Sequence, residues 1–165
     1  MAALVYRHPV DRLICRFKFG RDFACGRLLF HEMLDAIRGK EGPLPDLVVA
    51  VPLHRARHLC RSFNQADLLA RQLAPALGLH VRGDLLSRVR RTQAQSGLDA
   101  TSRRRNVRGV FRTCRMAGPI LAGAHVALVD DVMTTGATLA EGAKVLKGSG
   151  AARVTVWVAA RAPST

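Results

Sequence analysis

The sequence predicts a single α/β domain built on a mostly parallel sheet that is flanked by helices. Three apolar runs without polar alternation, at residues 47–51, 126–129 and 154–159, have the composition of strands that are buried on both faces. Stretches with helical spacing lie between them, and this alternation is typical of a parallel sheet with crossover helices. A length of 165 residues fits one ordinary domain, and a hydrophobic content of 48% excludes wholesale disorder.

The first quarter of the chain is expected to be helical. Apolar residues recur at helical spacing on both sides of a break at Gly20, in the sets Val10, Leu13, Ile14, Phe17 and Phe23, Phe30, Met33, Leu34, Ile37. Residues 39–45 are rich in glycine and proline and indicate a loop, after which the strand at 47–51 ends at Pro52. We therefore divide the domain into a helical part, residues 1–45, and a sheet core, residues 46–165.

The middle of the chain predicts one clear helix and several weaker elements. Residues 62–65 fit a capping box, and the apolar face that follows continues to Gly78. Short strands are expected at 79–81, 85–86 and 110–111, and a helix at about residues 100–106. After the strand at 126–129, apolar residues at helical spacing predict a helix that ends near Gly148.

The segment 126–138, VALVDDVMTTGAT, is the strongest functional signal in the chain. Asp130 and Asp131 are expected at the carboxyl end of a strand, where open α/β sheets bind ligands. The turn after them contains Thr134, Thr135, Gly136 and Thr138, and its hydroxyls, its backbone amides and the following helix N-terminus suit a phosphate. The carboxylates would instead accept hydrogen bonds from sugar hydroxyls or hold a hydrated divalent cation. The structural alternative is a strand end followed by a capped helix.

Charge is concentrated in one part of the chain. The net charge is +14, and residues 81–115 hold ten arginines against two aspartates. This asymmetry favours an anionic partner, either a nucleic acid or a polyphosphate. Phe111 is the one aromatic residue in that segment, so the stacking residues of a dedicated single-strand reader are not interleaved with the arginines.

Several classes of protein are disfavoured by the sequence. The four cysteines lie far apart without a C-x-x-C pair, which argues against a zinc site. No apolar stretch is long enough to cross a bilayer, and the first residues do not have the pattern of a signal peptide. The sequence therefore predicts a cytoplasmic protein without a membrane partner.

The order of residues in 126–138 resembles the phosphoribosyl diphosphate signature of type I phosphoribosyltransferases. Further blocks resemble the ComF family, the competence-associated and GntX-like branch of that superfamily: Phe17-Lys18-Phe19-Gly20, Val51-Pro52-Leu53-His54, Arg61-Ser62-Phe63-Asn64-Gln65, Thr92-Gln93-Ala94-Gln95 and the run from Arg103 to Phe111. Ser62 departs from the usual glycine of its block. Many members of this family look as though they carry an amino-terminal four-cysteine zinc module, and this chain starts without it, so no such module is carried over.

The resemblance implies the type I phosphoribosyltransferase fold with a small N-terminal helical hood, and it implies roles for particular residues. Asp130 and Asp131 would be catalytic, by orienting the ribose. The residues implied in substrate binding are Val132, Met133, Thr134, Thr135, Gly136, Ala137 and Thr138 in the signature, Pro52, Leu53, His54 and Arg55 after the first strand, Asn64 and Gln65, and Arg91, Gln95, Arg103 and Arg104. Those last four lie in residues 88–115, expected to be a mobile basic loop that closes over the substrate.

For function, the resemblance implies binding of phosphoribosyl diphosphate or a nucleoside monophosphate, with Mg²⁺ as cofactor held through the substrate and by Asp130 and Asp131. The reaction would be transfer of, or from, the phosphoribosyl group, with the acceptor unspecified. The alternative is a non-catalytic protein of DNA uptake that binds single-stranded DNA or a competence helicase, and a homodimer is left open. Because fold alone does not decide chemistry, both readings stay open at this point.

Overall fold

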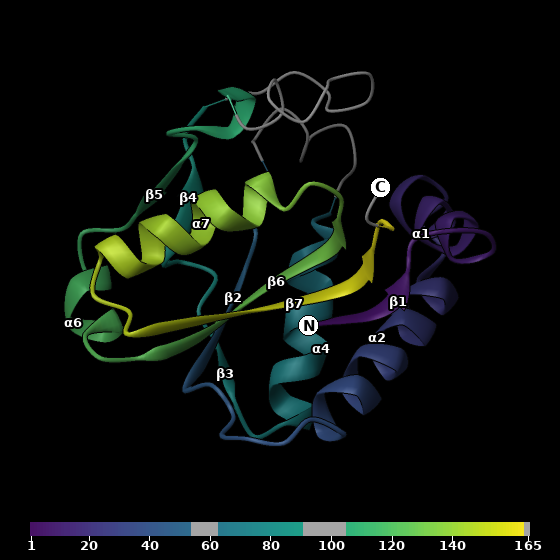
Figure 1. Cartoon of the computed structure of the whole chain (residues 1–165), viewed down its shortest axis with the longest axis horizontal. Helices are drawn as coiled ribbons and strands as arrows, with labels where there is room; N and C mark the ends of the chain where they lie inside the picture. Colours follow the sequence, from purple (N-terminus) through teal and green to yellow (C-terminus); the bar gives the residue numbers. More distant parts are fainter. Residues whose placement is uncertain (54–62, 91–104, 164–165) are drawn as a thin grey trace.

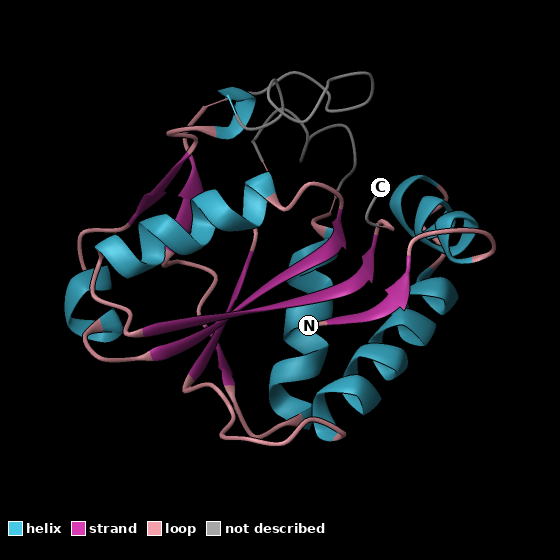
Figure 2. Cartoon of the chain, in the orientation of Figure 1, coloured by secondary structure: helices cyan, strands magenta, loops and turns pink. Residues whose placement is uncertain are grey.

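The central sheet of the protein has five strands, all parallel (Figures 1 and 2). The computed structural model describes residues 1–53, 63–90 and 105–163. Across the sheet the order is β1-β7-β6-β2-β3, and the strands are β1 (Ala2–Val5), β7 (Arg153–Arg161), β6 (His125–Met133), β2 (Leu47–Ala50) and β3 (His80–Val81). The prediction of a parallel sheet flanked by helices is therefore confirmed.

Alternate residues of the central strands bury two separate cores, one on each face of the sheet. Val48, Ala50 and Val129 pack on one side against α1 (Val10–Phe19), α2 (Phe23–Arg38) and α4 (Gln65–Ala76). Val49 and Leu128 point to the other side, toward α6 (Ala117–Leu121) and α7 (Ala137–Gly148). Burial on both faces explains why these strands are continuous apolar runs rather than alternating ones.

The N-terminal part of the chain differs from the prediction. Its helices are present, but residues 2–5 form β1, which pairs in parallel with the edge of β7 through Ala2–Val158 and Leu4–Ala160. The boundary at residue 45 between a helical part and a sheet core is therefore wrong. α2 lies along one face of the sheet, whereas α1 lies near the carboxyl ends of the strands (Figure 1).

Residues at both ends of the arginine-rich segment are folded rather than loop-like. β4 (Leu86–Arg88) pairs antiparallel with β5 (Phe111–Thr113) in a second, two-stranded sheet, and Phe111 is buried. The guanidinium of Arg90 donates to the carbonyl oxygens of Asn106 and Arg108. The expected loop over 88–115 is thus wrong for residues 88–90 and 105–115, while 91–104 lies outside the described residues, as does most of the expected helix at 100–106.

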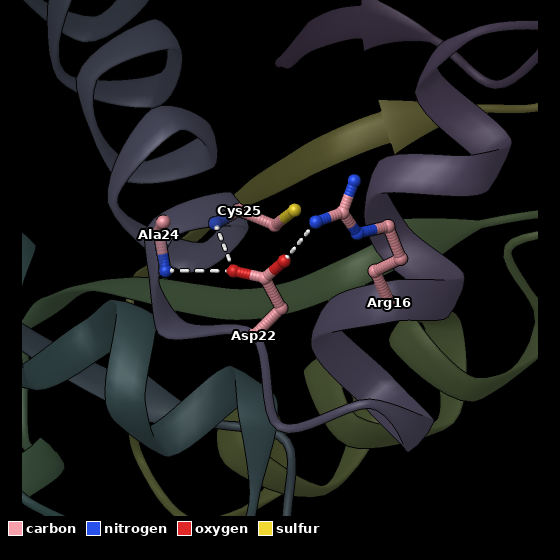
Figure 3. A network of polar contacts seen from close by, with 4 residues as sticks. All are labelled: Arg16, Asp22, Ala24 and Cys25. Atoms are coloured by element: carbon pink, nitrogen blue, oxygen red, sulfur yellow. Dashed lines mark hydrogen bonds and ion pairs between the residues drawn. The ribbon is translucent and has the colours of Figure 1, made fainter.

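A network of polar contacts fixes the junction between α1 and α2 (Figure 3). The carboxylate of Asp22 caps α2 by accepting hydrogen bonds from the backbone N–H groups of Ala24 and Cys25 at 3.1 and 3.2 Å. Its second oxygen pairs with the guanidinium of Arg16 on α1 at 2.6 Å. These contacts, led by the backbone hydrogen bond from Cys25, hold the pKa of Asp22 below its usual range. The junction therefore fixes how α2 is oriented relative to α1.

Candidate functional site

Asp130 and Asp131 lie inside β6 rather than beyond its end. The strand continues to Met133, and its pairing with β7 extends through Asp130–Val158, Val132–Ala160 and Met133–Arg161. β2 ends earlier, with Ala50 opposite Val129. The expected strand end at Val129 thus matches the end of the ladder between β6 and β2, whereas the ladder between β6 and β7 continues to Met133. Because β6 and β7 project past β2, the two carboxylates still lie at the carboxyl edge of the sheet, where the sequence placed them.

The two carboxylates have different surroundings. Asp131 is 7% exposed, and its Oδ2 lies 3.0 Å from the Nζ of Lys18 on α1. Asp130 is only partly buried, and its Oδ1 accepts a hydrogen bond from the backbone N–H of Asp131 at 2.9 Å. Desolvation and the negative charge of Asp131 raise the pKa of Asp130 to about 7, against the opposing effect of that hydrogen bond and of the charges on Lys18 and Arg88. The pair thus combines Asp131, which is ion-paired with Lys18, with Asp130, whose raised pKa favours the protonated form.

The turn after β6 leads directly into α7. Gly136 is the N-cap residue of α7 and has a φ of 73°, in the left-handed region that favours glycine. The hydroxyl of Thr135 accepts the N–H of Ala137 at 3.5 Å, and Thr134 is exposed. α7, which is described over its whole length, has no acidic residue in its first turn. An anion placed there would meet backbone donors and the positive end of the helix dipole. The structure therefore brings the predicted carboxylates and the predicted phosphate turn together.

The residues predicted after the first strand and in the arginine-rich segment divide into two groups. Pro52 and Leu53 follow β2 at the same edge of the sheet and are partly exposed. His54, Arg55, Arg91, Gln95, Arg103 and Arg104 lie outside the described residues, so their predicted roles stay predictions. The described part of the site therefore consists of β6, the turn after it, the N-terminus of α7, the residues directly after β2 and Lys18 on α1.

Asn64 and Gln65 have structural partners. The side-chain oxygen of Asn64 caps α4 by accepting the N–H of Ala66 at 3.2 Å, and its amide donates to the carbonyl of Val51 at 3.0 Å. Gln65 is 2% exposed and donates to the carbonyl of Lys18 at 3.4 Å. The structure thus favours the capping role for Asn64. The side chain of Gln65 is turned into the protein, and its predicted contact with a substrate stays a prediction.

Sequence reasoning missed two basic residues beside the acidic pair. Lys18 lies within the Phe-Lys-Phe-Gly block, but nothing in the linear sequence shows that α1 comes back to the end of β6. Arg88, at the end of β4, lies over the ring of Phe111 at 5.6 Å and is close enough to lower the pKa of Asp130. Only the tertiary structure joins these elements to the signature.

Within the described ranges there is no group of three or more histidine, cysteine or acidic residues that could hold a metal ion. Since Asp131 is already paired with an ammonium group, Asp130 is the carboxylate with capacity for a cation. A magnesium ion that arrived with a ligand's phosphates would have Asp130 as its protein contact among the described residues. Among these same residues, no helix is both long and apolar enough to span a bilayer.

Comparison with known proteins defines the class of this chain. The family model of the phosphoribosyl transferase domain matches residues 61–165, which include the acidic pair, the phosphate turn and α7. A glutamine phosphoribosylpyrophosphate amidotransferase from B. subtilis shares the fold, with a TM-score of 0.51 at 21% identity over 81% of this chain. This chain spans only 26% of that one. This chain thus contains a phosphoribosyl transferase domain and has the fold of that class.

Relatives of known name show to which family within this class the chain belongs. The DNA utilization protein YhgH of Salmonella typhi is 43% identical over 160 residues, covering 94% of this chain and 69% of the relative. Competence protein F of Haemophilus influenzae is 39% identical over 161 residues, covering 95% and 70%. This chain therefore belongs to the ComF family of the phosphoribosyltransferase superfamily, as the sequence motifs predicted.

Proposed function

We propose that the protein binds phosphoribosyl diphosphate with Mg²⁺ at the carboxyl edge of the sheet and transfers the phosphoribosyl group. One observation carries this proposal: two carboxylates on β6 are followed at once by the left-handed Gly136 turn and the N-terminus of α7. That arrangement offers acceptors for two neighbouring hydroxyls beside donors for one phosphate, which are the groups that a ribose 5-phosphate presents.

The chemistry is a displacement at the anomeric carbon of the ribose. The bond from the acceptor to that carbon forms as the bond to the diphosphate oxygen breaks, and the electron pair leaves with the diphosphate. Asp130 and Asp131 orient the hydroxyls and offset the positive charge that develops on the sugar. The turn before α7 fixes the 5′-phosphate, so that binding energy serves alignment. Magnesium, when bound with the diphosphate, would supply positive charge for the leaving group.

Calorimetry with phosphoribosyl diphosphate and MgCl₂ tests the proposal. We expect the wild-type protein to bind, and the Asp130→Asn/Asp131→Asn variant to bind at least about tenfold more weakly, because it loses charge-assisted hydrogen bonds to the ribose. Asp35→Asn, an exposed change on α2, is the matched control and should bind as the wild type does. Diphosphate release across a panel of acceptors then identifies the acceptor. Absence of binding by the wild-type protein would reject the proposal.

Single-stranded DNA binding is a second candidate function, favoured by the arginines of residues 81–115 and by the names of the curated relatives. Arg108, Arg112 and Arg115 are exposed around β5, and each could neutralise a DNA phosphate. We expect oligonucleotide affinity to fall at least about tenfold between 50 and 200 mM salt, as counterion release requires. Replacing the three arginines by glutamine should flatten this dependence, while Arg27→Gln on α2 should not. A salt-independent affinity in the wild-type protein would argue against this function.

A further inference from the structure

Lys18 gives the acidic pair a counter-ion of the protein's own. Its Nζ lies 3.0 Å from Oδ2 of Asp131, and the two side chains are only 20% and 10% exposed. An ion pair this well shielded from water is screened much less than a surface pair. Lys18 therefore holds a position at Asp131 that a divalent cation would otherwise compete for.

The helix that carries Lys18 is held in place from several sides. Phe17, the preceding residue, is 1% exposed, and its ring lies 5.8 Å from that of Phe63. A Cβ added at Gly26 of α2 would come within 2.7 Å of the Phe17 ring, so glycine permits the close approach of the two helices. These contacts leave α1 little freedom to withdraw Lys18 from the acidic pair.

Gln65 holds the backbone of Lys18 itself. It is buried at the start of α4 and donates a hydrogen bond to the Lys18 carbonyl at 3.4 Å. A glutamine at this position in the core is costly unless it is hydrogen-bonded. Its bond therefore ties the carboxyl end of α1, where Lys18 lies, to the helix that follows β2.

We infer that Lys18 is a positioning residue that excludes free divalent cations from Asp131, so that the metal enters the site only with the phosphates of a ligand. The ammonium holds the Asp131 carboxylate in place at 3.0 Å, and it repels a second cation at the same carboxylate. The inference rests on the proposed function only in treating the acidic pair as the ligand site. It predicts a property of the ligand-free protein, which can be measured with metal alone.

The test is a titration of the ligand-free protein with MnCl₂ at pH 8, followed by the electron paramagnetic resonance signal of free Mn²⁺. We expect the wild-type protein to show no tight site at the acidic pair. Lys18→Met keeps a long unbranched side chain but removes its charge. This variant should bind one Mn²⁺ at least about tenfold more tightly than the wild type. Lys18→Gln should do the same. Lys18→Arg retains the positive charge and should behave as the wild type does.

Two controls make the result decisive. Adding Asp131→Asn to Lys18→Met should abolish the new site, since that carboxylate is the one uncovered, and circular dichroism reports whether each variant is folded. A tight Mn²⁺ site in the wild-type protein that Asp131→Asn removes would overturn the inference. So would the lack of tighter binding in folded Lys18→Met or Lys18→Gln. Either outcome leaves the binding of phosphoribosyl diphosphate to be judged by its own calorimetry.

Discussion

Replacement of Gly136 by valine is expected to weaken binding of ribose 5-phosphate by roughly 100-fold, which corresponds to about 2.7 kcal/mol. The φ of 73° at this residue costs a side chain about 1–2 kcal/mol, and more when the side chain is β-branched. The nearest atoms to an added Cβ are those of Met133, at 3.6 Å, so the effect comes from the backbone rather than from a clash. Relaxing this strain would turn the amides before α7 away from the phosphate, and one or two charge-assisted hydrogen bonds account for the loss.

Gly148 at the other end of α7 offers the matched control. An added Cβ there meets nothing within 4 Å, and its φ lies outside the left-handed region, so Gly148→Ala should bind as the wild type does. Calorimetry with ribose 5-phosphate measures both variants. Wild-type affinity in folded Gly136→Val would mean that the phosphate is held somewhere other than at this turn.

At pH 8, Asp130→Asn is expected to raise the free energy of unfolding, relative to the wild type, by about 2 kcal/mol more than it does at pH 5. The pKa of Asp130 is raised from 3.8 to about 7, so its contribution to stability is complete below the unfolded-state value and is lost as the pH rises through 7. Above that pH the folded protein holds an ionised carboxylate beside Asp131. Asparagine carries no such charge, and its advantage therefore grows over this interval.

Urea unfolding of the wild-type protein and of Asp130→Asn at pH 5 and pH 8 measures this effect. Asp35→Asn on the exposed face of α2 controls for general effects of removing a charge, and should show no such pH-dependent gain. Equal differences in the free energy of unfolding at the two pH values for Asp130→Asn would mean that Lys18 and Arg88 fully offset the desolvation of this carboxyl group.

The buried strands were predictable because burial on both faces leaves a simple pattern. β2 and the central part of β6 are runs of apolar residues, and no other element tolerates them so well. The end of β6 was placed too early because Asp130 and Asp131 are polar. They remain in the strand because β7 continues the ladder beside them as far as Met133, and this long-range pairing leaves no trace in the local sequence.

The candidate site was predictable where it is local and was missed where it is assembled from distant segments. Asp130, Asp131 and Gly136 are close in sequence, so their spacing alone indicated a sugar-phosphate site. Lys18 reaches Asp131 because α1, which packs through the buried Phe17, lies beside the end of β6. β1, which precedes α1, adds to the edge of β7. The four residues of β1 carry too little pattern to be recognised, and they form a strand because β7 offers an open edge.

The sheet has a step, because β6 and β7 project past the end of β2. This step determines which neighbouring strand holds the acidic pair. The backbone of the acidic pair is fixed by β7. On the side of β2, the pairing among the described residues ends where the N–H of Val51 donates to the carbonyl of Val129. The position of the carboxylates therefore depends on the β7 ladder beside them. A substitution that shifts the register of β6 against β7 by one residue would turn both aspartates to the opposite faces of the sheet, and the candidate site would be lost.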